Sequence, residues 1–251
     1  MGGAPMPELA DRCIASWKKY MPEWKIKRWD ETNFDIAVAP VYVRQAYAVR
    51  HYAFVSDYVR LWALERYGGV YMDVDFEVYR SFDGLLDKYA AFAGYEGSKR
   101  KPVMQGVIAS EPHGAWVKDM LETYKFREFI KADGSLDLTP NTTYFSDRLE
   151  AQGFVADGEE KDVYVNDGMN RVDALNETLT LNDKIFYVHV FPVHYFCPQL
   201  TTGESVRNDE TYCEHKGKSS WAQYGWKAKL LAWLSPTMRT KLIKLKRRIF
   251  G

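Results

Sequence analysis

The region from 41 to 78 constrains the fold of this chain more than any other part of its sequence. Four apolar residues recur there at helical spacing and predict a helix over roughly 41–67 with one face in a core: Val55, Tyr58, Val59 and Trp62. Gly68 and Gly69 follow, and glycine readily adopts the left-handed backbone angles that end a helix. Apolar and polar residues then alternate over 70–78, which predicts a strand directly after the helix.

The remaining sequence continues this alternation of helices and strands. Further helices are expected at 8–20, 116–124 and 226–250, and further strands at 24–29, 90–95, 103–110 and 188–196. Such alternation predicts an α/β fold with a mostly parallel sheet and flanking helices. The 251 residues fit one such domain, expected at 1–225, followed by a basic amphipathic helical tail at 226–251. Ligands of such sheets bind beyond the carboxyl ends of the strands.

Charge and cysteine content indicate which partners and which cellular compartment suit the chain. Basic and acidic residues number 34 each, but eight of the basic ones fall in 226–251, where no acidic residue occurs. The remainder is therefore acidic, and we expect no nucleic-acid partner. Three cysteines far apart in sequence favour free thiols in a reducing compartment. Neither an apolar run of about 18 residues nor a signal peptide is visible, so a cytoplasmic location is expected.

Two aspartates near the end of the predicted strand 70–78 are the most informative polar residues. Residues two apart on a strand share a face, so Asp73 and Asp75 are expected to point the same way. Their mutual repulsion would be relieved by a divalent cation, and Mn²⁺ or Mg²⁺ prefers oxygen ligands together with substrate phosphates. A half-exposed strand with its polar face in water, which also includes Glu77, is the simpler alternative.

The surroundings of these aspartates resemble a known family. Ser56-Asp57-Tyr58-Val59-Arg60, then Tyr67-Gly68-Gly69-Val70-Tyr71, then Asp73-Val74-Asp75 are similar to glycosyltransferases with a DXD sugar-binding motif, glycosyltransferase family 32. These include bacterial capsular-polysaccharide transferases, fungal mannosyltransferases and, more distantly, large glucosylating toxins. Phe196-Cys197-Pro198 and the spacing of His215 to Ser220-Trp221 extend the resemblance. It implies a GT-A fold with a single Rossmann-like sheet.

The resemblance also implies a role for individual residues. Asp73 would face the nucleotide ribose and the metal, Asp75 would bind the metal directly, and His215 would be a later metal or diphosphate ligand. Asp57 and Arg60 would hold the donor sugar and, with Asp75, form the catalytic set. The remaining nucleotide-sugar contacts would come from Ser56, Gly69, Gln105, Ser220 and Trp221. An exposed ion pair at i and i+3 is the alternative explanation for Asp57 and Arg60.

One departure from the family concerns its first strand. Members usually carry an extended strand immediately before a Gly-Gly-x-Pro sequence, whereas here Met1 precedes Gly2-Gly3-Ala4-Pro5 directly. Loss of a central strand exposes unpaired backbone groups and apolar surface on its neighbours. We therefore expect weak donor binding, a compensating strand from elsewhere, a partner that supplies one, or a start that lies upstream.

Taken together, the sequence predicts a glycosyltransferase that depends on Mn²⁺ or Mg²⁺. It would move a hexose from a nucleotide-diphosphate sugar, with UDP favoured, to a glycan or lipid-linked acceptor in bacterial surface polysaccharide synthesis. The resemblance implies retention of anomeric configuration. Residues 237–250 would either lie on an anionic membrane surface, peripherally at its inner face, or dock on the domain.

Two other functions compete with this prediction. A degenerate scaffold that binds sugar nucleotides without turnover is the first. An aspartyl phosphohydrolase is the second, and it is disfavoured because Glu77 stands where such enzymes expect threonine.

Overall fold

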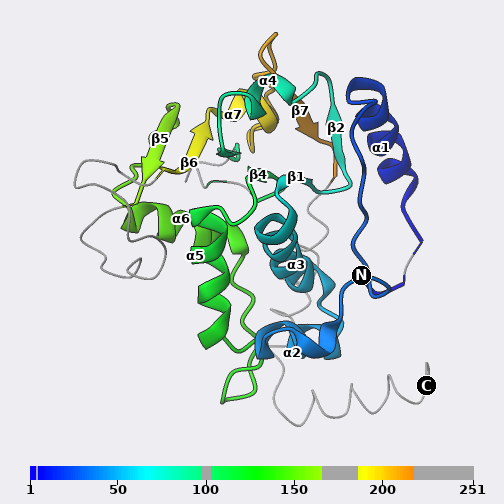
Figure 1. Cartoon of the computed structure of the whole chain (residues 1–251), viewed down its shortest axis with the longest axis vertical. Helices are drawn as coiled ribbons and strands as arrows, with labels where there is room; N and C mark the ends of the chain where they lie inside the picture. Colours follow the sequence, from blue (N-terminus) through cyan, green and yellow to red (C-terminus); the bar gives the residue numbers. More distant parts are fainter. Residues whose placement is uncertain (4, 98–102, 104, 166–185, 218–251) are drawn as a thin grey trace. The chain divides into compact units, whose positions relative to one another are not determined.

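The computed structural model describes residues 1–3, 5–97, 103, 105–165 and 186–217 (Figure 1). The chain divides into two compact units, Met1–Lys216 and Gly217–Gly251. Of the second unit, only Gly217 belongs to the described residues. The predicted tail 226–251, with its membrane-facing segment 237–250, lies outside them, as do Ser220 and Trp221.

Two sheets organise the first unit. The larger has the strand order β1-β4-β3-β6-β5, and the smaller pairs β2 with β7. The bounds are β1 Gly69–Met72, β2 Phe76–Val78, β3 Ala91–Gly94, β4 Val107–Ser110, β5 Lys161–Tyr164, β6 Phe186–Phe191 and β7 Cys213–His215. Helices flank these strands, so the predicted α/β class with a GT-A-like arrangement is confirmed.

The prediction of a mostly parallel sheet is wrong for the strands that the structure describes. Only β3 and β6 run parallel, whereas β1–β4, β3–β4, β5–β6 and β2–β7 are antiparallel. The physical reason is the connection that leads from β3 to β4. No helix is described in this connection, and β4 takes a place in the sheet between β1 and β3. A short return makes an antiparallel pair, because a parallel pair needs a long crossover.

The helices largely follow the sequence pattern. They are α1 Glu8–Tyr20, α2 Val41–Ala48, α3 Tyr52–Tyr67, α4 Asp83–Leu86, α5 Ala115–Thr123, α6 Asn141–Ala151 and α7 Val193–Phe196, with short 3₁₀ turns η1 Ile36–Val38 and η2 Tyr124–Phe126. The single helix predicted over 41–67 is split, because Arg50 adopts a φ of 63° that breaks the helical path. The segment 24–29 forms no strand.

Apolar side chains pack on both faces of the large sheet. Within β4, Ile108 faces the cluster built with α2, α3, α5 and α6, whereas Val107 and Ala109 face the cluster built with α1, α4 and α7. This alternation is that of a strand buried on both sides. Figure 1 shows α3, α5 and α6 on one side of the large sheet and α4, α7 and the small sheet on the other.

Two further properties follow from the described residues. All three cysteines are free and buried. Among the helices that the structure describes, none combines the length and apolar character needed to cross a lipid bilayer.

Gly68 is the residue that redirects the chain from α3 into β1. Its φ of 63° and ψ of −164° belong to a region that only glycine adopts readily, and an added Cβ would lie 2.6 Å from Pro112 Cδ. We expect Gly68→Ala to lower the free energy of unfolding by about 2 kcal/mol or more. Urea denaturation measures this loss. Gly84→Ala is the matched control, because its added Cβ meets nothing within 4 Å; equal effects of the two variants would contradict the prediction.

Candidate functional site

Asp73 and Asp75 lie in a tight turn rather than on one strand face. β1 ends at Met72, β2 begins at Phe76, and the Phe76 N–H donates to the Asp73 carbonyl over 3.2 Å. The predicted single strand 70–78 is therefore wrong. It is interrupted because β1 pairs with β4 in the large sheet, while β2 leaves to pair with β7 in the small one. The turn consequently sends its two carboxylates to different neighbours.

Asp73 faces helix α3. Its Oδ1 accepts a 2.6 Å hydrogen bond from the Tyr71 hydroxyl and lies 3.5 Å from Arg60 Nη2. The Arg60 guanidinium also sits over the Tyr71 ring, 4.6 Å from its centroid. The Asp73 N–H donates to the Gly106 carbonyl over 2.8 Å, so backbone and side chain are both held.

Arg60 is the centre of a buried polar cluster. Its Nη2 lies 2.9 Å from Asp57 Oδ1, and its Nη1 donates to the Gln105 carbonyl over 2.5 Å. The side chains of Arg60 and Asp57 are only 8% and 17% exposed, so the exposed ion pair considered from sequence is wrong. Burial by itself lowers the pKa of Arg60, but the neighbouring side chains of Asp73, Tyr71 and Asp57 raise it overall and keep the guanidinium protonated.

Burial shifts the pKa of Asp57 in the direction opposite to its effect on Arg60. Loss of solvent raises its pKa from the ordinary 3.8 to about 6, with Arg60 opposing the shift and Asp73 adding to it. The ionised Asp57 carboxylate is therefore kept away from the water that would stabilise its charge. Such a group gains from a ligand that donates hydrogen bonds to it.

This shift gives a pH prediction for Asp57→Asn. The folded chain holds the Asp57 proton more tightly than the unfolded chain, so the contribution of Asp57 to stability is lost as pH rises from about 4 to about 6. The variant escapes that loss and should gain on the order of 2 kcal/mol relative to wild type between these pH values. Urea denaturation at both pH values measures the gain. The exposed Asp87→Asn variant is the control, and a pH-independent difference for Asp57→Asn would refute the assignment.

Asp75 faces the small sheet. Its Oδ2 lies 3.1 Å from His215 Nε2, and its carbonyl accepts the Lys216 N–H over 2.8 Å. The register of β2 with β7 places Phe76 opposite His215, and the two rings stack at 4.9 Å. Burial alone lowers the pKa of His215, but the hydrogen bond to Asp75 and the charges of Asp75, Asp73 and Glu96 raise it overall.

The capacity of this pair to hold a metal can be judged from its donor atoms. Within the described ranges, no group of three or more His, Cys, Asp or Glu side chains is placed to hold a metal ion. Asp75 and His215 nevertheless bring a carboxylate oxygen and an imidazole nitrogen together, and both are ligand types of divalent metals. The pair therefore fits part of a metal shell, which further ligands would have to complete.

Three other predicted residues occupy different places. The Ser56 carbonyl accepts from Arg60 Nε over 3.4 Å, so the backbone of Ser56, rather than its hydroxyl, contributes to the cluster. Gln105 is buried beside Arg60. Gly69 begins β1 and therefore lies at the opposite end of that strand from the turn. The structure thus brings Asp57, Arg60 and Gln105 together and leaves Gly69 apart.

Several residues of the cluster escaped the sequence analysis. Tyr71 stands two residues before Asp73, the spacing that puts side chains on one face of an expected strand, so the pattern contained this signal. Asn141 donates from Nδ2 to Gln105 Oε1 over 3.1 Å and accepts from the Tyr124 hydroxyl over 3.3 Å. Its 36-residue separation from Gln105 gives no local signal. Glu96 follows β3 as a partly buried carboxyl group, and burial raises its pKa while His215 lowers it.

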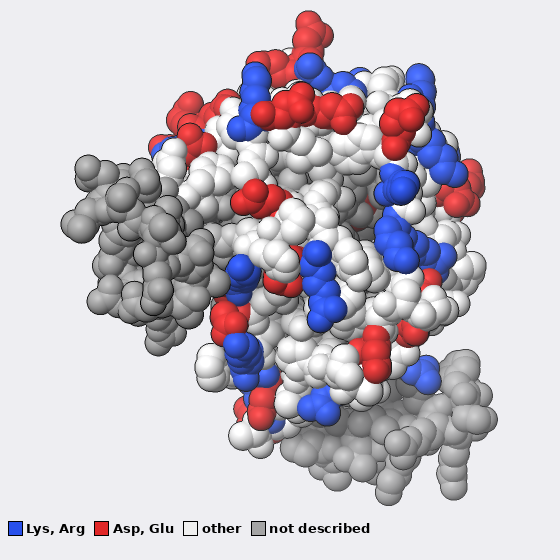
Figure 2. Space-filling view, viewed as in Figure 1, with Lys and Arg blue, Asp and Glu red and all other residues white. Residues whose placement is uncertain are grey.

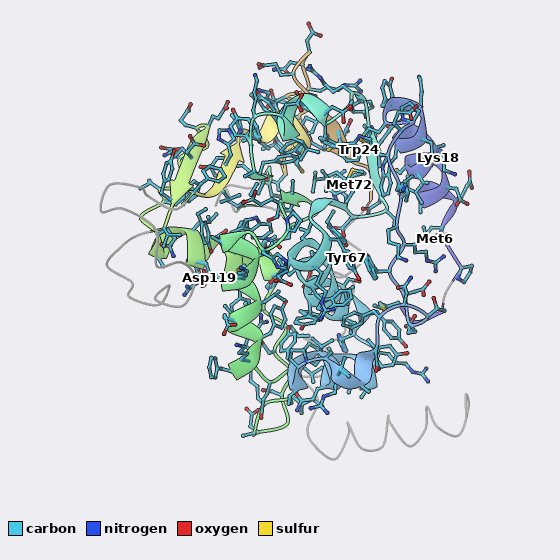
Figure 3. The ribbon with its side chains drawn as sticks, viewed as in Figure 1. Met6, Lys18, Trp24, Tyr67, Met72 and Asp119 are labelled. Atoms are coloured by element: carbon cyan, nitrogen blue, oxygen red, sulfur yellow. The ribbon has the colours of Figure 1, made fainter. Side chains whose placement is uncertain are left out.

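The surroundings of the turn are visible in the figures. Figure 3 labels Tyr67, the last residue of α3, and Met72, the residue before the turn, so the path from helix to carboxylates is a single short strand. Figure 2 shows basic and acidic side chains interspersed on the part of this face that the structure describes.

Comparison with known proteins concerns this same region. Residues 7–92 match the family model described as a glycosyltransferase sugar-binding region containing a DXD motif. The matched segment includes Asp57, Arg60 and the Asp73–Asp75 turn. Comparisons with curated proteins and with solved structures give no match. The match and the buried Asp57–Arg60–Asp73 cluster support assignment of this region to a glycosyltransferase family with a DXD-containing sugar-binding region.

Proposed function

We propose that the chain is a metal-dependent glycosyltransferase that transfers a hexose from a UDP-sugar to a glycan or lipid-linked acceptor. The observation that carries this proposal is the turn at Asp73–Asp75. On one side it joins the buried Arg60 cluster, and on the other it joins Asp75 to His215. The proposed sugar-binding group and the proposed metal-binding pair therefore meet at Asp73 and Asp75, which are two positions apart in sequence.

Asp57 and Arg60 would recognise the sugar as a matched hydrogen-bond acceptor and hydrogen-bond donor. The Asp57 carboxylate would accept hydrogen bonds from sugar hydroxyls, and Arg60 would donate to others while it neutralises Asp57 and Asp73. Because α3 carries both groups, the Gln105 carbonyl holds Arg60 and Arg60 holds Asp57, they lose little freedom when a ligand arrives.

The diphosphate side would use Asp75 and His215. These two residues would hold Mn²⁺ or Mg²⁺ together with oxygens of the diphosphate, and the metal would neutralise the negative charge that builds on the leaving phosphate. Asp57 and Asp73 are both engaged by Arg60, so neither carboxylate is free to attack the sugar. We therefore favour attack by the acceptor hydroxyl on the face from which the diphosphate leaves, with retention of configuration.

Titration calorimetry with UDP-glucose, UDP-galactose and GDP-mannose, with and without Mn²⁺, tests this function. Binding that requires the metal is expected for at least one UDP-sugar. Slow release of UDP from that donor, measured separately, distinguishes an enzyme from a sugar-nucleotide-binding scaffold. Absence of metal-dependent binding for all three donors would reject the proposal.

The acceptor remains part of the same proposal. The basic sequence at 237–250 suits an anionic membrane surface and hence a lipid-linked acceptor in surface polysaccharide synthesis. Co-sedimentation with vesicles containing anionic lipid compares the full chain with one that ends at Ser235. Equal binding of the two chains would show that 237–250 does not bind the membrane.

A further inference from the structure

Residues 105–106 connect the two halves of the Arg60 cluster through consecutive backbone carbonyls. The Gln105 carbonyl accepts from Arg60 Nη1 over 2.5 Å, and the Gly106 carbonyl accepts from the Asp73 N–H over 2.8 Å. One short piece of backbone therefore sets the positions of Arg60 and Asp73 together. Gly106, the second of these two residues, admits no side chain, because an added Cβ would lie 2.7 Å from the Phe76 ring and 3.2 Å from Asp73 Oδ2.

Helix α6 contacts the side chain of Gln105 through one of its own side chains. Asn141, the first residue of α6, donates from Nδ2 to Gln105 Oε1 over 3.1 Å and is only 4% exposed. The Tyr124 hydroxyl in turn donates to Asn141 Oδ1 over 3.3 Å. The side chains of Tyr124, Asn141 and Gln105 thus form a continuous buried chain of hydrogen bonds that ends beside Arg60.

Elements remote in sequence anchor the outer end of this chain. The Tyr124 ring contacts those of Tyr42 and Tyr58 edge to face at centroid distances of 5.4 and 5.1 Å. The Arg127 guanidinium lies 4.6 Å from the Tyr124 ring. The Tyr124 hydroxyl is therefore fixed by packing, which makes it a rigid support for Asn141.

We propose that Asn141 and Tyr124 are positioning residues for the sugar-binding group, acting through Gln105 on Arg60 and Asp73. This inference rests on the proposed function, because it assigns these residues to recognition of the donor sugar. When the Asn141 hydrogen bond is lost, the 105–106 backbone relaxes, and Arg60 and Asp73 shift together. Affinity for the sugar part of the donor then falls, while affinity for the nucleoside diphosphate changes little.

A ratio of affinities isolates this effect. Calorimetry in the presence of Mn²⁺ compares each nucleotide sugar with its own nucleoside diphosphate, and the pair with the largest difference in wild type becomes the probe. We expect Asn141→Ala to reduce the preference for the sugar-bearing ligand about tenfold, and Tyr124→Phe about threefold, which are the effects of losing one buried hydrogen bond. Thr143→Ala in the same helical turn is the matched control, because Thr143 is exposed.

A double-mutant cycle shows whether Asn141 acts through Gln105. If it does, the Gln105→Ala/Asn141→Ala variant shows the same preference as Gln105→Ala alone. Full preference in Asn141→Ala and Tyr124→Phe, or losses that multiply in the double variant, would overturn the inference. If wild type binds nucleotide sugars with Mn²⁺ but no better than their diphosphates, this inference is overturned while the proposed function stands; if it binds none of them in a metal-dependent way, the proposed function itself fails. Should Asn141→Ala not fold, Tyr124→Phe decides, because it keeps the packed ring.

Discussion

Asp75→Asn is expected to reduce metal-dependent release of UDP from the donor at least about a hundredfold, since loss of a direct metal ligand should exceed the 10- to 100-fold cost of losing an outer-shell partner. The variant keeps the shape of the side chain but loses the charge that a cation requires. The fold should survive, because the Asp75 side chain is about one-third exposed and its carbonyl still accepts the Lys216 N–H. Coupled detection of UDP at saturating Mn²⁺ measures the rate.

Glu77→Gln is the matched control for this experiment. Glu77 lies on β2, two residues beyond Asp75, and contacts Tyr79 and Lys216 instead of His215. Glu77→Gln removes the same charge from a residue close to Asp75, on β2, without changing the Asp75–His215 pair. Turnover within a few-fold of wild type in Asp75→Asn, or an equal loss in both variants, would remove Asp75 from the metal site.

Arg60→Met should produce the largest loss of stability among substitutions in this site. The variant leaves Asp57 buried without its counter-charge and also removes the cation beside Asp73. Breaking a buried ion pair from one side costs about 3 to 5 kcal/mol, because the remaining charge has lost both water and partner. Urea denaturation at pH 7 measures the loss.

The double variant Arg60→Met/Asp57→Asn identifies the cause of that loss. Removing the orphaned carboxylate should restore much of the stability, although donor binding stays lost in both variants. Arg66→Met on the exposed side of the same helix provides the control. A loss below about 1 kcal/mol in Arg60→Met, or no recovery in the double variant, would contradict the buried-charge explanation.

Local signals in the sequence predicted local structure well. The bounds of α1 and the α3–Gly68–β1 junction follow from helical periodicity and from the backbone freedom of glycine. The pairing of Asp57 with Arg60 follows from their i, i+3 spacing, because both residues belong to one helix. Each of these features is decided within a few residues of chain.

Features set by tertiary pairing could not be predicted in this way. The alternation of 70–78 fits a single strand, yet the chain changes sheets at Asp73 because β4 and β7 offer different partners. The contact of Asp75 with His215 spans 140 residues, and that of Gln105 with Asn141 spans 36. The antiparallel direction of most strands was missed for the same reason. In the large sheet β4 lies between β1 and β3, and local sequence does not specify these neighbours.

The two carboxylates of the Asp73–Asp75 turn are fixed to separate frameworks, one through Arg60 and the other through β7. Their spacing is therefore a dimension of the assembled protein and is not encoded by the three residues themselves. A chimera that exchanged β7 for that of another protein would alter this dimension unless it also carried the matching β2. Recombination in this scaffold should accordingly treat residues 73–79 and 212–216 as one inherited module.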